Sequence, residues 1–238
     1  IFMGTPEWSI PSLKSILNLG IEISAVFTQP DRRIGRKKQI MQSPIKIYSE
    51  KNDLKVFTPE NVSCVENINM VNSLEPELII VCAYGQILSE SFLKIPKVGC
   101  FNLHFSFLPK LRGASPVQSA IYSGISETGV CIQKMIFRLD AGPIVASSIA
   151  LDIKPDETSP RLGERLAEAG GNILHDVLPD LLRNNFLVVE QNENDATYCK
   201  SIKKEEGHIC WKKENAEQIE RKSRAFVPWP GIFSFFSS

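Results

Sequence analysis

The feature that most constrains the fold is an unbroken apolar run, Leu-Ile-Ile-Val-Cys-Ala, at residues 78–83. A run of this length and composition is typical of a strand that is buried on both faces of a sheet. Apolar segments flanked by turn residues indicate further strands on both sides of it. We expect these strands at residues 1–3, 21–27, 56–57, 98–101, 129–135 and 144–151.

Helical patterns separate the expected strands. Ser9 and Ser43 are each followed closely by a proline, the order found where a helix begins with a capping side chain. Apolar residues at helical spacing also cover residues 115–123 and 158–182. Strands that alternate with helices predict a Rossmann-like α/β domain with a mostly parallel sheet. We expect residues 30–42, which are polar and basic, to form a loop.

The sequence pattern changes near residue 183, which predicts a division of the chain. Residues 1–182 are expected to form the α/β domain, and the polar, Asn-rich stretch 183–203 a linker. Residues 204–238, with an amphipathic helix at 216–225, are expected to begin a second, smaller domain. Both ends read as cut strands, so we expect the sequence to be a fragment of a longer protein.

Composition excludes some classes of function. Lys plus Arg and Asp plus Glu both number 27, so the overall charge gives no sign of a nucleic-acid partner. The 6 cysteines lack the close spacing of a zinc site, and we expect no bound metal. No signal peptide or apolar run of membrane-spanning length is recognisable. A reducing compartment is expected, either the bacterial cytosol or an organelle matrix.

Candidate catalytic residues lie where the strand at 98–101 ends. Asn102 and His104 are two residues apart, so they can share one face of an extended chain. An amide donor beside an imidazole is suited to acyl chemistry. Asp140, in a Gly-Pro loop between two later strands, could reach the same face and orient the imidazole. Alternatively, His104 is a hydrogen-bonded core residue and Asp140 a turn residue.

A basic segment at residues 30–39 is the second candidate. It contains five cations within seven positions: Arg32, Arg33, Arg36, Lys37 and Lys38. Such a charge run is usually a solvated loop, but it can also contact nucleic-acid phosphates. Its spacing alone does not decide between these two interpretations.

Together these residues resemble the folate-dependent formyltransferases. Asn102-x-His104, followed by Ser-Phe-Leu-Pro at 106–109 and Arg112-Gly113, is similar to the formyl-transfer signature of that family. Leu-Asp-Ala-Gly at 139–142 matches its catalytic Asp loop. The resemblance covers the whole chain, with further matching blocks at residues 2–7, 127–130, 156–158 and 228–231.

The resemblance implies a formyl transfer from 10-formyltetrahydrofolate that requires no metal. Asn102, His104 and Asp140 take the catalytic positions. The folate is placed beside two loops, at residues 84–88 and 106–109. The residues implied to bind it are Tyr84, Gly85, Gln86, Ile87, Leu88, Ser106, Phe107, Leu108 and Pro109.

The basic segment selects a branch within this family. Residues 28–46 look like the loop that, in the tRNA-directed members, enters the acceptor stem, and Arg36 matches its functional arginine. The resemblance therefore implies transfer to the amino group of methionyl initiator tRNA, by a protein that we expect to be monomeric. Residues 204–238 correspond to the start of a small β-barrel that grips tRNA. Two alternatives stay open: formylation of a nucleotide-linked amino sugar, and a non-catalytic folate- or RNA-binding module.

Two departures from the family pattern occur within the matched blocks. Phe105 and Phe107 replace smaller or aliphatic residues, and we expect them to reshape the folate pocket. Arg33-Ile34 replaces a Pro-Ala pair, which makes the basic loop more cationic and less stiff.

Overall fold

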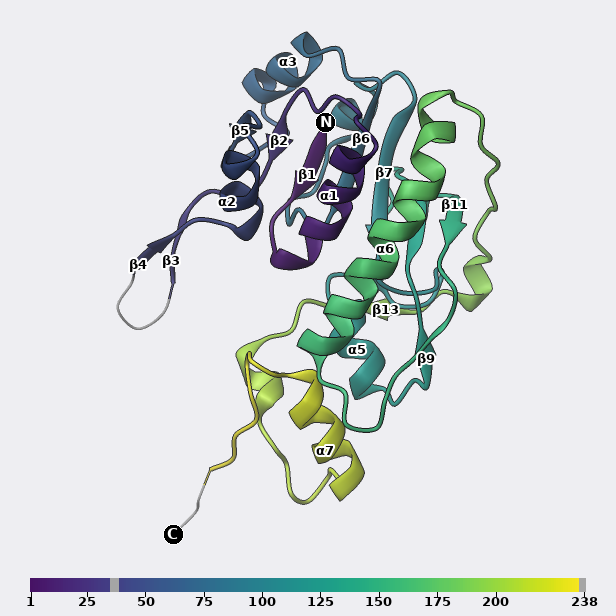
Figure 1. Cartoon of the computed structure of the whole chain (residues 1–238). Coiled ribbons are helices and arrows are strands. Elements are labelled where there is room, and N and C mark those ends of the chain that lie inside the picture. The colour runs from purple at the N-terminus through teal and green to yellow at the C-terminus, as the bar shows by residue number, and fades with distance from the viewer. Residues whose placement is uncertain (35–38, 236–238) are drawn as a thin grey trace.

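A central sheet organises the molecule in the computed structural model, which describes residues 1–34 and 39–235 (Figure 1). Its spatial order is β11-β10-β7-β6-β1-β2-β5. The chain forms these strands at β1 (Phe2–Gly4), β2 (Val26–Phe27), β5 (Val56–Phe57), β6 (Leu78–Cys82), β7 (Gly99–His104), β10 (Cys131–Lys134) and β11 (Ile144–Ser147).

The sheet is mostly parallel, as the alternating pattern predicts. Neighbours from β5 through β2, β1 and β6 to β7 pair in parallel, and β10 and β11 add antiparallel strands at one edge. The apolar run becomes β6, whose five residues are all buried. Strand order reverses between β1 and β6, and ligands of open α/β sheets bind beside the carboxyl ends of strands at such a point.

Helices cover both faces of the sheet. α1 and α6 pack against each other on one face (Figure 1). α3 and α4, which the sequence patterns did not predict, contribute Val71 and Phe92 to the core on the other face. The helices are α1 (Ile10–Asn18), α2 (Pro44–Lys51), α3 (Val65–Ser73), α4 (Glu90–Leu93), α5 (Pro116–Tyr122), α6 (Ser159–Leu182) and α7 (Ala216–Ala225).

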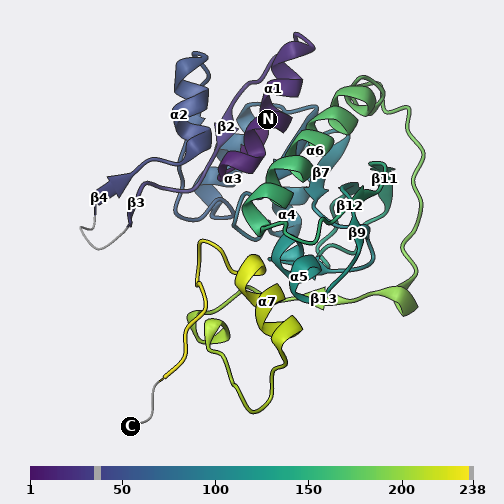
Figure 2. The same cartoon turned by 60° about the horizontal axis from the view of Figure 1, so that its bottom comes forward.

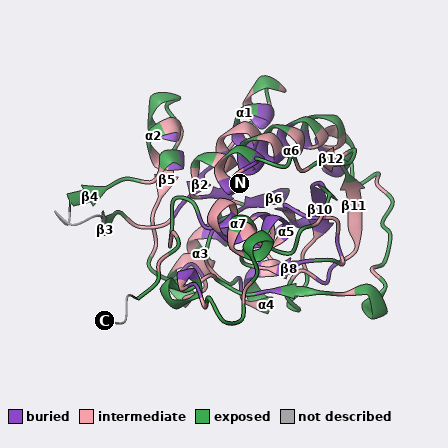
Figure 3. Ribbon diagram, turned by 90° about the horizontal axis from the view of Figure 1, so that it is seen from below, coloured by how far each residue is buried: buried purple, intermediate pink, exposed green. Residues whose placement is uncertain are grey.

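Two hydrophobic cores form because side chains alternate across each strand. Ile80 and Leu103 belong to the first core, beneath α1 and α6. Ile79 and Cys100 belong to the second core, on the opposite face. Buried residues accordingly run along the central strands in Figure 3. The alternation also places residues 102 and 104 on the side of Cys100, away from the first core.

The two predicted helix starts differ in what their serines do. Ser43 caps α2, because its Oγ accepts a hydrogen bond of 3.0 Å from Lys46 N–H. Ser9 immediately precedes α1 but makes no capping bond. Its hydroxyl donates instead to the Cys82 carbonyl at 2.6 Å, which ties the start of α1 to the end of β6.

Three predicted boundaries are wrong. The strand expected at 21–27 contains only β2, and the one expected at 144–151 divides between β11 and β12 (Leu151–Asp152). β12 leaves the central sheet to pair with β9 (Glu127–Thr128). The strand expected at 98–101 continues to His104, because its backbone pairs with β10 past the end of the apolar segment.

The expected loop at 30–42 contains a hairpin of β3 (Arg32–Ile34) and β4 (Gln39–Met41). It projects beside α2 (Figure 1). β4 is exposed along its length, so the sequence of the hairpin needs no alternation of apolar and polar residues. Backbone pairing between β3 and β4 holds the hairpin together. Hydrophobic periodicity therefore does not predict this hairpin. Residues 35–38 lie outside the described part of the chain.

In the C-terminal region, α7 packs against α5 (Figure 2). The bounds of α7 match the predicted helix. The stretch 183–203 returns to the α/β domain, where β13 (Tyr198–Cys199) pairs with β8 (Arg112–Gly113). Short 3-10 turns occupy Glu7–Ser9, Glu193–Asp195 and Lys204–Gly207. The proposed division at 182 and 203 stays a prediction. Among the described helices, none has the length and apolarity to cross a membrane.

The packing of α6 can be tested by two substitutions. Leu166 is fully buried, so Leu166→Ala should lower the free energy of unfolding by about 2–5 kcal/mol through lost contacts and a cavity. Glu168→Ala, on the exposed side of the helix, should change it by less than about 0.5 kcal/mol. Urea unfolding followed by circular dichroism measures both. Equal effects would contradict the described orientation of α6.

Candidate active site

The site is built on one face of two neighbouring strands. Asn102 and His104 alternate with Cys100 along β7 and therefore point to the same side. β10 runs antiparallel to β7 in a register that places Gln133 opposite Asn102. Directly opposed residues of two strands share a face, so Gln133 joins the other two polar side chains.

The loop that carries Asp140 folds back over this face. β10 ends opposite Phe101, and the chain then reverses so that Lys134 N–H donates to the Pro143 carbonyl at 2.9 Å. Gly142 lies so close to the start of the loop that a Cβ there would be 1.8 Å from the Lys134 carbonyl oxygen. Only glycine fits this approach. Asp140 itself has a φ of 46°, in the left-handed region that is strained for a residue with a side chain.

Hydrogen bonds hold the Asp140 carboxylate at the centre of the site. The Gly113 N–H donates to Oδ2 at 2.8 Å, and Gln133 Nε2 donates to Oδ1 at 2.8 Å. Asn102 Nδ2 lies 3.5 Å from Oδ1, and His104 Nδ1 lies 3.7 Å from Oδ2. The three predicted catalytic side chains therefore converge on one place.

The partners of His104 determine its tautomer. Its side chain is 5% exposed, and Nε2 lies 2.8 Å from the Leu111 carbonyl oxygen. A carbonyl only accepts, so Nε2 must carry a proton. Neutral His104 consequently presents an unprotonated Nδ1 toward Asp140, whereas the imidazolium presents a donor there. The ring can thus take up a proton at Nδ1 without rotating.

Gln133 and Gly113 complete the site, and neither was predicted to do so. Gln133 is 1% exposed, and its Oε1 also accepts from Gly142 N–H at 3.2 Å. The sequence did contain a signal for Gln133, because it places a polar amide within the otherwise largely apolar strand segment 130–135. The role of the Gly113 N–H could not be predicted from the sequence, because it depends on where the Asp140 loop lies in the folded protein.

The two loops implied to bind folate follow the neighbouring parallel strands β6 and β7, so they emerge at the same edge of the sheet. In the first, Gln86 is tied to the preceding segment through the Pro59 carbonyl and Val62 N–H, both at 2.8 Å. Ile87 is 85% exposed, while Tyr84 and Leu88 are buried in the second core. Gly85 has a φ of 88°.

A hydrogen bond within the second implied folate loop stabilises its conformation. Ser106 is buried, and its hydroxyl donates to the Lys110 carbonyl at 2.6 Å. Leu108 is also buried, whereas Phe107 and Pro109 are partly exposed. The assignment of folate to these two loops stays a prediction.

The two unusual phenylalanines occupy different places. Phe105 belongs to the first core, on the face of β7 opposite His104, and its ring centroid lies 6.3 Å from that of Trp8. This position does not support the expectation that Phe105 reshapes the folate pocket. Phe107 packs against Gly129, where a Cβ would lie 2.3 Å from its ring.

A cavity of about 410 Å³ lies at the point where the strand order reverses. It joins the ends of β1 and β6 to the base of the β3–β4 hairpin. Thr5 Oγ1 and Gln29 Nε2 both donate to the Tyr84 carbonyl, at 2.8 and 3.2 Å, and fix its floor. The cavity is lined by Thr5, Pro6, Gln29, Pro30, Arg32, Met41, Gln42, Ser43, Pro44, Ala83, Tyr84 and Gly85.

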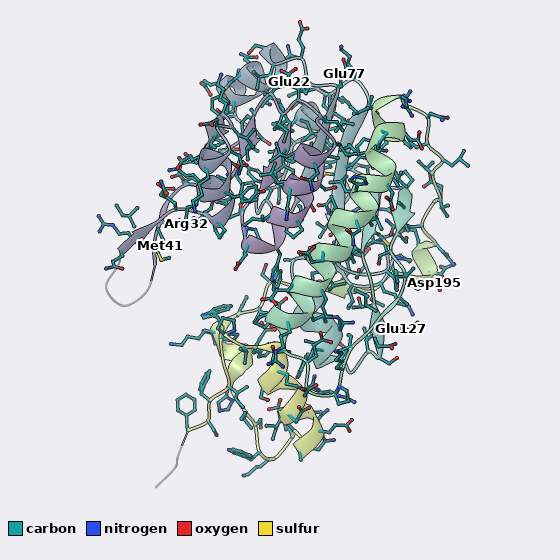
Figure 4. All side chains as sticks on the ribbon, in the orientation of Figure 1. Glu22, Arg32, Met41, Glu77, Glu127 and Asp195 are labelled. Carbon is teal, nitrogen blue, oxygen red and sulfur yellow. The ribbon has the colours of Figure 1, made fainter. Side chains whose placement is uncertain are left out.

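Two of the predicted cations lie on this hairpin. Arg32 and Arg33 are exposed on β3, and Arg32 pairs with Met41 across the hairpin (Figure 4). Arg32 Nη2 donates to Gln29 Oε1 at 2.8 Å. Lys46 and Asp31 form an ion pair of 2.7 Å at the hairpin base. The remaining predicted cations, Arg36, Lys37 and Lys38, lie outside the described residues.

Within residues 1–34 and 39–235, no cluster of three or more His, Cys, Asp or Glu side chains is arranged to hold a metal ion.

Solved structures share this fold. A methionyl-tRNA formyltransferase from Clostridium thermocellum superposes with a TM-score of 0.65 at 19% identity, over 99% of this chain and 86% of the other. A 4-N formyltransferase from Francisella tularensis gives 0.76 at 18% identity, over 98% and 90%. At these identities the likeness concerns the fold.

Sequence comparison gives the family. The formyl transferase model matches residues 2–178, and the model of the formyl transferase C-terminal domain matches residues 201–238. Methionyl-tRNA formyltransferases of Marinobacter nauticus and of Bacillus thuringiensis subsp. konkukian are 41% and 38% identical over 98% of this chain. The chain spans 75% and 74% of their lengths. With the model matching most of the chain and relatives this similar, the chain belongs to the formyl transferase family.

Proposed function

We propose that this protein transfers a formyl group from 10-formyltetrahydrofolate to the α-amino group of methionine on initiator tRNA. The observation that carries the proposal is the convergence of Asn102, His104 and Asp140 on one face of the sheet. Relatives at 38–41% identity that are named methionyl-tRNA formyltransferases support the choice of acceptor.

In this mechanism Asn102 and His104 stabilise developing negative charge. When an amine attacks a formyl carbon, the carbonyl oxygen becomes an oxyanion. Asn102 offers the amide N–H, and protonated His104 offers Nδ1–H on the same face. One such preorganised donor typically contributes about 3–4 kcal/mol to lowering the barrier.

Asp140 serves as the proton acceptor and as the partner of His104. Its carboxylate has fixed donors in Gly113 N–H and Gln133 Nε2, so its direction is set before substrate arrives. His104 Nδ1 lies 3.7 Å from Oδ2, which is an ion-pair distance and too long for a direct hydrogen bond. Asp140 accepts the amine proton. The bond between the formyl carbon and N10 of the folate then breaks, and N10 takes up that proton and leaves as tetrahydrofolate.

The residues present fit a folate. 10-Formyltetrahydrofolate supplies the formyl group, and its flat ring system needs both an apolar surface and hydrogen-bonding peptide groups. The exposed side chain of Ile87 offers the first, on a loop that Gln86 fixes in place. The fixed backbone around Gly85 offers the second. Phe107 and Pro109, partly exposed after β7, border the same edge of the sheet.

The hairpin suits an RNA acceptor. Arg32 and Arg33 are exposed on an element that projects from the domain, where cations can meet phosphates. The cavity at the hairpin base connects this element to the carboxyl edge of the sheet. An acceptor strand held by the hairpin would be directed toward the site. Such a protein acts as a monomer where translation starts, in the bacterial cytosol or an organelle matrix.

Formylation of an amino sugar is the second candidate, because a sugar N-formyltransferase from Shewanella superposes with a TM-score of 0.76, against 0.65 for the methionyl-tRNA enzyme. Purified protein with 10-formyltetrahydrofolate should formylate methionyl initiator tRNA and leave a nucleotide-linked amino sugar unmodified. Mass spectrometry of both acceptors in one reaction measures this. Transfer to the sugar alone would reverse the assignment, and folate binding without transfer to either would favour a binding module.

Alanine substitution of the three site residues tests the mechanism. Asn102→Ala, His104→Ala and Asp140→Ala should each lower kcat on the order of a hundredfold or more, because each removes a group used at the reacting atoms. Asn172→Ala, His175→Ala and Asp176→Ala change the same residue types on the exposed side of α6 and should leave kcat unchanged. Near-normal turnover by one site variant would remove that residue from the mechanism.

Substitution on the hairpin tests the RNA contact. Arg33→Ala should raise the KM for methionyl-tRNA and lower the salt dependence of tRNA binding by about one counterion, with folate binding unchanged. Arg183→Ala removes an exposed cation at the end of α6 and serves as the control. Arg36→Ala is expected to act as Arg33→Ala does. Equal losses of tRNA and folate binding would indicate a structural role for the hairpin.

A further inference from the structure

We infer that Gln191 is a positioning residue that holds the Asp140 loop in its working conformation. Gln191 belongs to the stretch 183–203, for which the sequence indicated only a linker. Its role in catalysis rests on the proposed function, whereas its hydrogen bonds to the loop do not.

The side-chain amide of Gln191 bridges two parts of the site. Its Nε2 donates to the carbonyl oxygens of Asp140 and Gly142, at 2.9 and 2.6 Å. Its Oε1 accepts from Arg112 Nε and Nη2, at 3.0 and 2.7 Å. Carbonyls only accept and a guanidinium only donates, so these four contacts fix the orientation of the amide. If the amide were flipped, its oxygen would face the two carbonyl oxygens and its N–H groups would face the guanidinium N–H groups.

Arg112 is the anchor of this bridge. Its side chain is 0% exposed, and its two remaining contacts are with Glu193 and Tyr198. Glu193 receives both guanidinium ends, Nη2 at Oε1 (2.9 Å) and Nη1 at Oε2 (3.1 Å). This carboxylate raises the pKa of Arg112, and Arg112 lowers the pKa of Glu193. A buried charge that is paired and fully hydrogen-bonded is costly to move, so it provides a stable reference point.

The Asp140 loop needs such an anchor. Asp140 is a non-glycine residue at a φ of 46°, a conformation that persists where surrounding contacts impose it. Gln133 holds the loop from the sheet, through the Asp140 carboxylate and Gly142 N–H. Gln191 holds the loop from the other side, through the backbone carbonyls of the same two residues. The two glutamines together fix both the direction of the carboxylate and the backbone that carries it.

Strand pairing brings Gln191 to this position. Tyr198 pairs with Arg112, and Cys199 with Gly113, in the parallel β13–β8 ladder. The same short strand β8 therefore supplies the guanidinium that orients Gln191 and the N–H that binds the Asp140 carboxylate. The stretch 183–203 is thus part of the active site as well as the connection to the C-terminal region.

Gln191→Glu separates the two halves of the bridge. A glutamate keeps the oxygen that accepts from Arg112, but it replaces the donor that faces the two loop carbonyls with an acceptor. We expect kcat to fall about tenfold or more, while the KM values for folate and tRNA stay within about twofold. Asn172→Asp, which makes the same amide-to-carboxylate change on the exposed side of α6, is the matched control and should leave both parameters unchanged. Unchanged kcat in folded Gln191→Glu would overturn the inference.

A double-mutant cycle distinguishes positioning from a general structural role. If Gln191 acts through Asp140, adding Gln191→Glu to Asp140→Ala should lower single-turnover rates no further. The same fold-loss in both backgrounds would overturn the inference. Gln191→Met, uncharged and of similar length, repeats the cycle should the glutamate variant unfold by circular dichroism.

A spectroscopic readout keeps the inference separate from the proposed function. The Gly113 N–H donates to Asp140 Oδ2, so its amide proton resonance reports on the position of the carboxylate. Gln191→Glu should shift that resonance, and Asn172→Asp should not. No shift would overturn the inference even if the wild-type protein formylates tRNA. A shift in a protein that formylates neither acceptor would uphold the inference and reject the proposed function.

Discussion

The antiparallel pairing of β10 with β7 is the constraint on which the site depends. Its register sets Gln133 opposite Asn102, and Ile132 opposite Leu103 in the first core. A slip of one residue would turn every β10 side chain to the other face, placing an amide among apolar residues and an isoleucine among the polar groups of the site. The hydrophobic core therefore enforces the same register that assembles the polar site.

A carboxylate surrounded by fixed donors follows from that register. Asp140 accepts from Gly113 N–H and Gln133, and its backbone is held by Gln191. Because these donors are in place before any substrate binds, little reorganisation is needed when charge develops, which is how preorganised sites stabilise transition states. His104 adds a group that can gain a proton at Nδ1 while Nε2 stays bonded to Leu111. In the proposed mechanism, this rigidity of the protein stabilises the charge that develops on the substrate.

Sequence patterns correctly predicted those elements in which the pattern of apolar residues matches the pattern of burial in the structure. β6 is apolar throughout and buried throughout, and α7 begins and ends at the residues that its amphipathic pattern predicts. They failed where contacts distant in sequence decide the outcome. Ser9 has the sequence context of a helix cap, yet its hydroxyl bonds to Cys82, 73 residues away. The β3–β4 hairpin is held by backbone pairing, which leaves no hydrophobic period to read.

The sequence by itself determined the parallel α/β architecture, because apolar strands alternate with helical patterns. It also indicated three candidate catalytic residues. Alternation along a strand places Asn102 and His104 on one face, and Asp140 lies in a loop that could reach it. Only the tertiary structure decided what surrounds them. Gly113, Gln133 and Gln191 come from three separate segments, and they meet because β8, β10 and the stretch before β13 are brought together by backbone pairing. Those pairings arise from main-chain hydrogen bonds that every residue except proline can make. Local side-chain patterns therefore do not show which distant segments pair with one another.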